Sequence, residues 1–188
     1  MALKRFECDG FGQLELNQVA FRRDGRIEAQ CALGDDFKTV PAENGMLLAV
    51  DNVNRIVKKP VAGEKFPIAL NYSTEHMYDE RTNALKDFSL NQKTFLPRLG
   101  YLAVGDKFTT NCLCYESGTF ANDEALKDAY TAAAMKTAPL YGVPSANGAI
   151  EVTKTAPESG LCLMAVLGTG AGSMPDGQFG MKFQVIAV

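Results

Sequence analysis

The chain has 188 residues, of which 46% are hydrophobic and 22% charged, and its 11 Phe and 6 Tyr can supply a packed core. This composition excludes a wholly disordered chain, a collagen-like repeat and a coiled-coil rod, and it favours one compact domain over residues 1–188. The formal net charge of −3, with no block of like charges, argues against nucleic acid as a partner. Such binding needs a basic face that displaces counterions from phosphates.

Strand signals dominate the first 72 residues. Residues 11–16 alternate apolar and polar, and Asp24-Gly25 predicts a hairpin turn between residues 19–21 and a returning strand at 27–33. A second hairpin is expected from a covered strand at 46–50, the pair Asp51-Asn52 and a strand at 53–59. Residues 66–72 form another expected strand, in which Pro67 indicates an edge or an early position.

The remaining strands follow the same signals, with one exception. We expect one or two helical turns within 73–94, and strands at 95–104, 107–115, 149–153, 161–167 and 179–188, with a turn at Asn147-Gly148. A helix is predicted over 122–136, because Asn122 can cap it, acidic residues fill its first turn and Pro139 blocks its continuation. The sequence therefore predicts a mostly β protein, an antiparallel β-barrel or β-sandwich, with one or two short helices and a helical or extended excursion near 120–138.

Membrane and secretory signals are weak. Glu7 and Asp9 interrupt any apolar run behind Lys4-Arg5, so no signal peptide is expected. The longest apolar run, 161–167, is far shorter than the roughly 20 residues that cross a bilayer, so no membrane association is expected. The five cysteines, Cys8, Cys31, Cys112, Cys114 and Cys162, are scattered as in reduced cytoplasmic proteins rather than in disulfide frameworks or zinc sites.

Residues that could carry chemistry are few. His76 is the single imidazole, and spacing ties no thiol, hydroxyl or carboxylate to it. Cys112 and Cys114 would share a strand face, which favours packing over a zinc or redox site. The loop with Gly168, Gly170 and Gly172 follows a strand but lacks the helix and later βα units of a dinucleotide fold. We therefore expect no catalytic residues, cofactor or resident metal, although an interface ion stays open.

Two stretches resemble a known family. Residues 95–111, FLPRLGYLAVGDKFTTN, precede an Ala-rich linker and a C-terminal series ending GQFGMKFQVI, and together they are similar to small structural proteins encoded beside the major capsid protein of tailed bacteriophages. This resemblance covers the C-terminal half. It implies a decoration (cement) protein of the virion, made in the host cytoplasm and bound to the outer capsid surface, with the major capsid protein as partner.

Such a protein would act through its surface and would form a homo-oligomer, a trimer or a dimer. We expect the contacts in the N-terminal segment, in residues 121–138 and in the loop 168–178. The interface candidates are Leu3, Phe6, Asn122, Leu126, Tyr130, Met135, Gly168, Gly170, Gly172 and Met174.

Three other classes stay open on the sequence. A glycan- or small-ligand-binding β-barrel would expose aromatic platforms, for which the candidates are Tyr72, Tyr78, Tyr101, Tyr115, Tyr130 and Tyr141. An enzyme would have to work through His76 or a Cys112–Cys114 dithiol. A tail or head–tail connector component would differ from a decoration protein only in its location.

Overall fold

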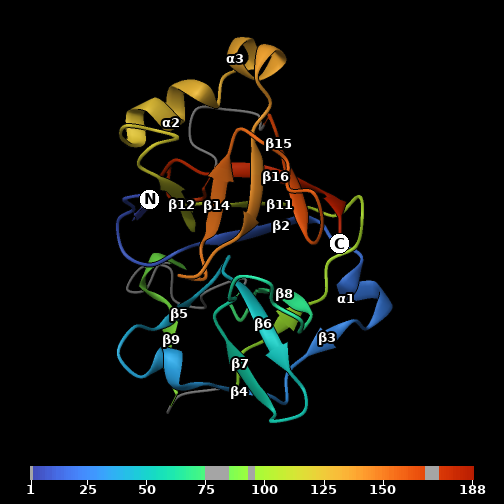
Figure 1. The fold of residues 1–188 in the computed structure, drawn as a ribbon. Helices are drawn as coiled ribbons and strands as arrows, with labels where there is room; N and C mark the ends of the chain where they lie inside the picture. Colours follow the sequence, from blue (N-terminus) through green and yellow to red (C-terminus); the bar gives the residue numbers. More distant parts are fainter. Residues whose placement is uncertain (1, 75–84, 93–95, 168–173) are drawn as a thin grey trace.

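The protein is mostly β, as expected. The computed structural model describes residues 2–74, 85–92, 96–167 and 174–188, and about 35% of these described residues are in strands and 14% in helices. The strands form a sheet of eight, a sheet of six and a pair (Figure 1). In the described residues neither large sheet closes on itself, so the sandwich-like arrangement replaces the barrel alternative.

The larger sheet collects the N-terminal strands and nearly all of the C-terminal half. Its order is β1-β12-β14-β13-β15-β16-β11-β2, and its pairs are antiparallel except β12 with β14. Its strands are β1 (Leu3–Arg5), β2 (Leu14–Gln18), β11 (Lys107–Thr110), β12 (Leu113–Glu116), β13 (Tyr141–Pro144), β14 (Ile150–Thr153), β15 (Cys162–Val166) and β16 (Met181–Ala187).

The smaller sheets come from the first hundred residues. The six-stranded sheet has the order β3-β10-β8-β6-β7-β4, with β4 and β7 parallel, and β5 pairs with β9 beside it. The strands are β3 (Ile27–Glu28), β4 (Ala32–Leu33), β5 (Ala42–Glu43), β6 (Leu47–Asp51), β7 (Ile56–Lys58), β8 (Ile68–Asn71), β9 (Ser89–Leu90) and β10 (Leu99–Gly100). Short helical turns accompany them at α1 (Phe21–Asp24), η1 (Asp35–Phe37) and η2 (Leu85–Asp87).

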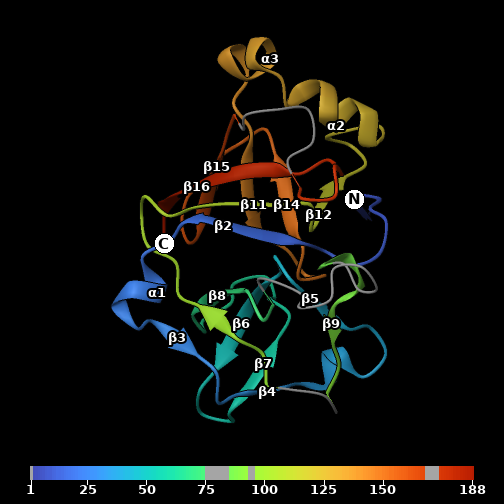
Figure 2. The same cartoon turned by 180° about the vertical axis from the view of Figure 1, so that it is seen from behind.

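One hydrophobic core joins the two large sheets. Leu47 and Leu70 of the six-stranded sheet pack in the same buried cluster as Phe108, Leu113 and Phe183 of the eight-stranded sheet. A second cluster lies on the other face of β6, where Leu48 and Val50 alternate with Leu47. All five residues of β6 are buried, which explains its continuous apolar run. The arrangement places the two termini on opposite sides of the molecule (Figure 2).

The excursion at 120–138 is helical but contains two helices instead of the single helix predicted over 122–136. Asn122 caps α2 (Asp123–Ala129) as expected, and its side chain accepts a hydrogen bond from the backbone of Ala125. Thr131 then adopts an extended conformation and caps α3 (Ala132–Thr137). A side-chain cap at Thr131 competes with helix continuation, because its hydroxyl bonds a local N–H group. The pair projects beyond the eight-stranded sheet (Figure 1).

Other expectations divide in the same way. The hairpin of β6 and β7 and the turn at Asn147-Gly148 between β13 and β14 are confirmed, and Gly148 has the positive φ of 88°. The hairpin at Asp24-Gly25 is wrong, because Gly25 ends α1 and the chain then enters the other large sheet. The strand expected over 107–115 is two strands, and the strand expected over 95–104 is reduced to β10 in the described residues.

Candidate functional site

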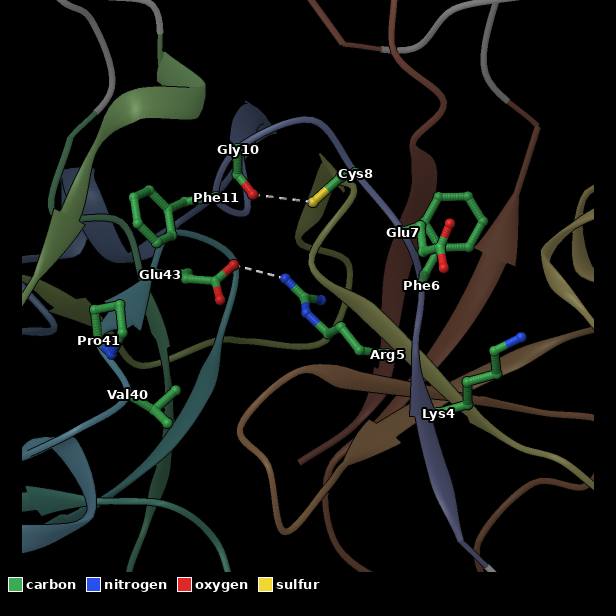
Figure 3. A pocket seen from close by; sticks show the side chains of 10 residues that line it. All are labelled: Lys4, Arg5, Phe6, Glu7, Cys8, Gly10, Phe11, Val40, Pro41 and Glu43. Atoms are coloured by element: carbon green, nitrogen blue, oxygen red, sulfur yellow. Dashed lines mark hydrogen bonds and ion pairs between the residues drawn. The ribbon is translucent and has the colours of Figure 1, made fainter.

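A cleft lies beside the N-terminal segment. Its volume is about 750 Å³, within the range of about 300–1,000 Å³ that small-molecule sites occupy. One wall is the segment from β1 onward, and the other is the stretch that leads into β5 (Figure 3). It is lined by Lys4, Arg5, Phe6, Glu7, Cys8, Gly10, Phe11, Val40, Pro41 and Glu43.

An ion pair crosses the cleft. Nη2 of Arg5 donates to Oε2 of Glu43 at 2.6 Å, and Nη1 donates to the carbonyl of Leu113 at 2.9 Å. Burial alone would lower the pKa of Arg5, but the thiolate that Cys112 becomes at high pH and the Glu43 carboxylate outweigh it and raise that pKa. The guanidinium is therefore charged and largely neutralised by Glu43. Figure 3 shows its side chain pointing across the cleft.

The same carboxylate also fixes the backbone. The N–H of Gly12 donates to Oε2 of Glu43 at 2.6 Å. A Cβ atom at Gly12 would lie 2.8 Å from the carbonyl oxygen of Asn44 and 2.8 Å from Cβ of Cys112, so only glycine permits this approach. Glu43 therefore ties β5 both to β1 and to the start of β2.

The thiol in the cleft is not activated. Sγ of Cys8 lies 3.7 Å from the carbonyl of Gly10. Burial raises the pKa of Cys8 above its ordinary value, more than the nearby Arg5 lowers it. Because the thiolate is the nucleophile, Cys8 is protonated at neutral pH and lacks the electropositive setting of a catalytic cysteine.

The thiols of Cys112 and Cys114 are packing groups. Both side chains are fully buried in the second cluster, on the shared side that their spacing predicts. Burial raises the pKa of Cys112 to about 12 and that of Cys114 to about 11. Sγ of Cys114 lies 3.4 Å from Oγ of Ser145. These environments make both thiols poor nucleophiles and poor metal ligands at neutral pH.

The described ranges hold neither a cluster of potential metal ligands nor a helix of membrane-spanning length. No group of three or more His, Cys, Asp or Glu side chains there is placed to hold a metal ion. No helix in those ranges is long and apolar enough to span a bilayer. His76, Tyr78 and the glycines Gly168, Gly170 and Gly172 lie outside the described residues.

A second hollow, of about 370 Å³, lies between the turn at 60–64 and the strand ends of the large sheet. Its walls are mostly proline and aliphatic side chains, with Val61 58% exposed at the rim. Glu64 is its buried charge: Oε1 accepts from the backbone of Lys65 and Phe66, and Oε2 lies 3.4 Å from Nζ of Lys58. The Lys58 ammonium in turn lies 4.6 Å from the Phe66 ring centroid. Through these contacts Glu64 stabilises the turn at 60–64.

The structure corrects three of the interface candidates. Phe6, Leu126 and Met174 are at most 3% exposed, so their side chains belong to the core and are not available to a partner in this conformation. Leu3, Tyr130 and Met135 are half-buried, and Asn122 is exposed at the start of α2. Helical spacing alone could not show whether the apolar face of α2 packs on the sheet or contacts a partner, because either role requires an apolar face.

The tyrosines considered as glycan platforms are also mostly internal. Tyr72 and Tyr115 are buried, and Tyr101, Tyr130 and Tyr141 are half-buried. The hydroxyl of Tyr130 donates to the carbonyl of Val166 at 2.6 Å and accepts from the N–H of Lys182 at 3.1 Å. The hydroxyl of Tyr115 donates to Oδ1 of Asp123 at 2.5 Å. These two tyrosines therefore anchor α2 to the large sheet.

Three sets of polar contacts connect distant segments of the fold, and the sequence did not predict them. Besides the Arg5–Glu43 pair, Oδ2 of Asp123 accepts from the N–H of Glu7 at 2.9 Å. Asp106 is 4% exposed and accepts from the N–H groups of Ala20 and Ala103. The partners are separated by 38 to 116 residues, except in the local bond to Ala103. For Asp106 the sequence does hold a local signal, the pair Gly105-Asp106, in which Gly105 has a positive φ of 97°.

Comparisons with protein-family models, with curated proteins and with solved structures return no match.

Proposed function

We propose that this chain is a structural protein of a tailed-bacteriophage virion, a decoration protein that binds the outer surface of the capsid and stabilises it. The observation that carries the proposal is that polar groups lining the cleft beside β1 are used for bonds within the fold. Arg5 and the Gly12 N–H both donate to Oε2 of Glu43, so this carboxylate ties β5 to β1 and to the start of β2. The resemblance of residues 95–111 and of the C-terminal series to such proteins supports the same function.

The projecting helices supply a surface for contact. Leu126 is buried and Tyr130 bonds β15 and β16, so α2 is held firmly on the sheet. The outer residues Ala132, Ala133 and Lys136 of α3 are exposed. A rigid base with a short exposed arm suits a protein that makes modest contacts at many equivalent positions, because repetition on a shell multiplies weak affinities.

The proposed partners are the major capsid protein and further copies of this chain, as a trimer or a dimer. Closed symmetry would match such an oligomer to the symmetry axes of a shell. Sedimentation equilibrium of the purified protein measures the oligomeric state directly. A monomer at all concentrations would remove self-association from the proposal.

The central experiment is co-sedimentation of the purified protein with expanded capsids that lack it. Binding is expected, and the substitutions Ala133→Glu and Lys136→Glu on α3 should weaken it without changing the circular dichroism spectrum. Glu158→Gln is the matched control, since Glu158 lies on an exposed loop far along the chain from α3. Failure of the unmodified protein to sediment with capsids, while another head protein of the same phage does, would refute the proposal.

A further inference from the structure

The outer edge of β1 has hydrogen-bonding groups without partners. In the antiparallel pairing of β1 with β12, the numbers of two opposite residues add up to 119, as for Lys4 opposite Tyr115. The bonds from Ser117 N–H to Ala2 carbonyl and from Phe6 N–H to Leu113 carbonyl follow the same register. The backbone N–H and C=O groups of residues two apart in an antiparallel strand point to the same side, so those of Lys4 also point toward β12. Leu3 and Arg5 therefore direct their N–H and C=O groups away from it.

Within the described part of the chain, no bond is made by these outward groups of Leu3 and Arg5. The next outward group, the N–H of Glu7, is already accepted by Oδ2 of Asp123. The free edge thus comprises two residues and ends at a carboxylate from α2. An added strand could use four backbone groups there, which is the pattern of recognition by strand addition.

The cleft continues this edge. Its lining includes every residue from Lys4 to Cys8. Successive side chains of an extended chain point to opposite faces, so a wall made of five consecutive residues includes their backbone. The opposite wall offers Val40, which is 47% exposed, and Pro41. An extended segment beside β1 would therefore have apolar side chains to contact on the cleft side.

Charge selects the occupant. Lys4 is exposed, and among the described residues it has no carboxylate within ion-pair distance, whereas the charge of Arg5 is met by Glu43. A second copy of this chain fits poorly, because the antiparallel register that uses both free residues of each copy places Lys4 opposite Lys4. Like charges directly opposite each other destabilise strand pairs, and opposite charges stabilise them. The edge thus favours a foreign strand with an acidic residue facing Lys4.

We propose that β1 is a docking edge for an extended, acidic segment of another protein, which adds to the eight-stranded sheet as a ninth strand with apolar residues toward Val40 and Pro41. This inference goes beyond the proposed function, since it requires no capsid and specifies how a partner polypeptide is held. Under the proposed function, the segment would belong to the shell.

The test uses the isolated full chain and a fluorescein-labelled nine-residue peptide in which Glu alternates with Val. Fluorescence anisotropy should show binding with a Kd below about 1 mM. Replacing Glu by Lys in the peptide should weaken binding about fivefold. N-methylation of alternate peptide nitrogens should abolish binding in the version that blocks the edge facing β1.

Matched variants of the chain separate the edge from its side chains. Leu3→Pro removes one outward N–H and leaves the ladder to β12 intact, so it should weaken the peptide about tenfold. Leu3→Ala, which shortens the same side chain but keeps the N–H, should stay within about twofold of the unmodified protein. Thermal unfolding of both variants checks that the fold persists.

Three results would overturn the inference. The first is no binding of the Glu-Val peptide at about 1 mM. The second is equal weakening by Leu3→Pro and Leu3→Ala. The third is a dimer of the protein alone that Leu3→Pro dissociates, since the edge would then serve a second copy. Each result is obtained without capsids, so it is distinguishable from failure of the proposed function.

Discussion

Removing the carboxylate of Glu43 should destabilise the fold strongly, because this one group accepts hydrogen bonds from two separate segments. In Glu43→Ala the N–H of Gly12 loses its acceptor, and an unpaired buried donor costs about 1–3 kcal/mol. The guanidinium of Arg5 also loses a charge-assisted bond worth about 1.5–3 kcal/mol. The Arg5 side chain is 31% exposed and can recover water, so the expected total is roughly 3 kcal/mol.

Urea unfolding followed by circular dichroism measures this difference, and the melting temperature should fall by about 6–12 °C in a chain of this size. A double-mutant cycle with Arg5→Met isolates the pair, for which we expect a coupling energy of about 1–2 kcal/mol. The exposed pair of Lys127 and Glu124 provides the control, and Glu124→Ala should leave the unfolding midpoint nearly unchanged. Equal effects of Glu43→Ala and Glu124→Ala, or strict additivity in the cycle, would show that the ion pair does not stabilise the connection between β1 and β5.

Three further predictions concern other contacts of the fold. Burial and the neighbouring Glu116 raise the pKa of Glu151, so Glu151→Gln should stabilise the protein at pH 7, and the gain should disappear as the pH falls below about 4, where the unfolded-state carboxyl is also protonated. Urea midpoints at pH 7 and pH 3.5 measure this, and a constant gain would contradict it. Gly100→Ala places a Cβ 2.6 Å from the Phe21 ring and should cost about 1–3 kcal/mol in thermal unfolding, with part of the loss recovered when Phe21→Leu is added. Full additivity of the two changes would reject the proposed clash. Tyr130→Phe leaves the N–H of Lys182 without its acceptor and should cost about 1–2 kcal/mol, with faster amide exchange at Lys182; unchanged exchange would mean that the hydroxyl does not hold α2 on β16.

Local signals account for the parts of the fold that the sequence predicts. Asn147-Gly148 and Asp51-Asn52 join strands that pair with each other, so turn chemistry and alternation suffice there. Asp24-Gly25 carries the same signal, but Gly25 ends a helical turn because Phe21 is buried and the chain changes sheet. A positive φ at glycine serves both structures, so the dipeptide alone cannot separate them.

Long-range pairing explains most of what the sequence could not show. The parallel pairs β12–β14 and β4–β7 depend on which segments meet across the core, and no adjacent turn encodes them. The candidate site has the same origin, since Arg5 and Glu43 are separated by 38 positions and neither lies in a recognisable motif. The short length of β10 has the same origin. Its two residues pair with β3 and β8, and the sequence alone does not show where these long-range pairings begin and end.

The pairing of β1 with β12 also has a consequence for biosynthesis. Residues 3–5 find their partner only when residues 114–116 have been made. At synthesis rates of about 5–20 residues per second, the ribosome needs roughly 5–20 s to produce that partner. Closure between such distant segments also slows folding. β1 therefore remains unpaired until β12 has been synthesised, and the charges of Lys4 and Arg5 disfavour aggregation through its exposed edge during that time.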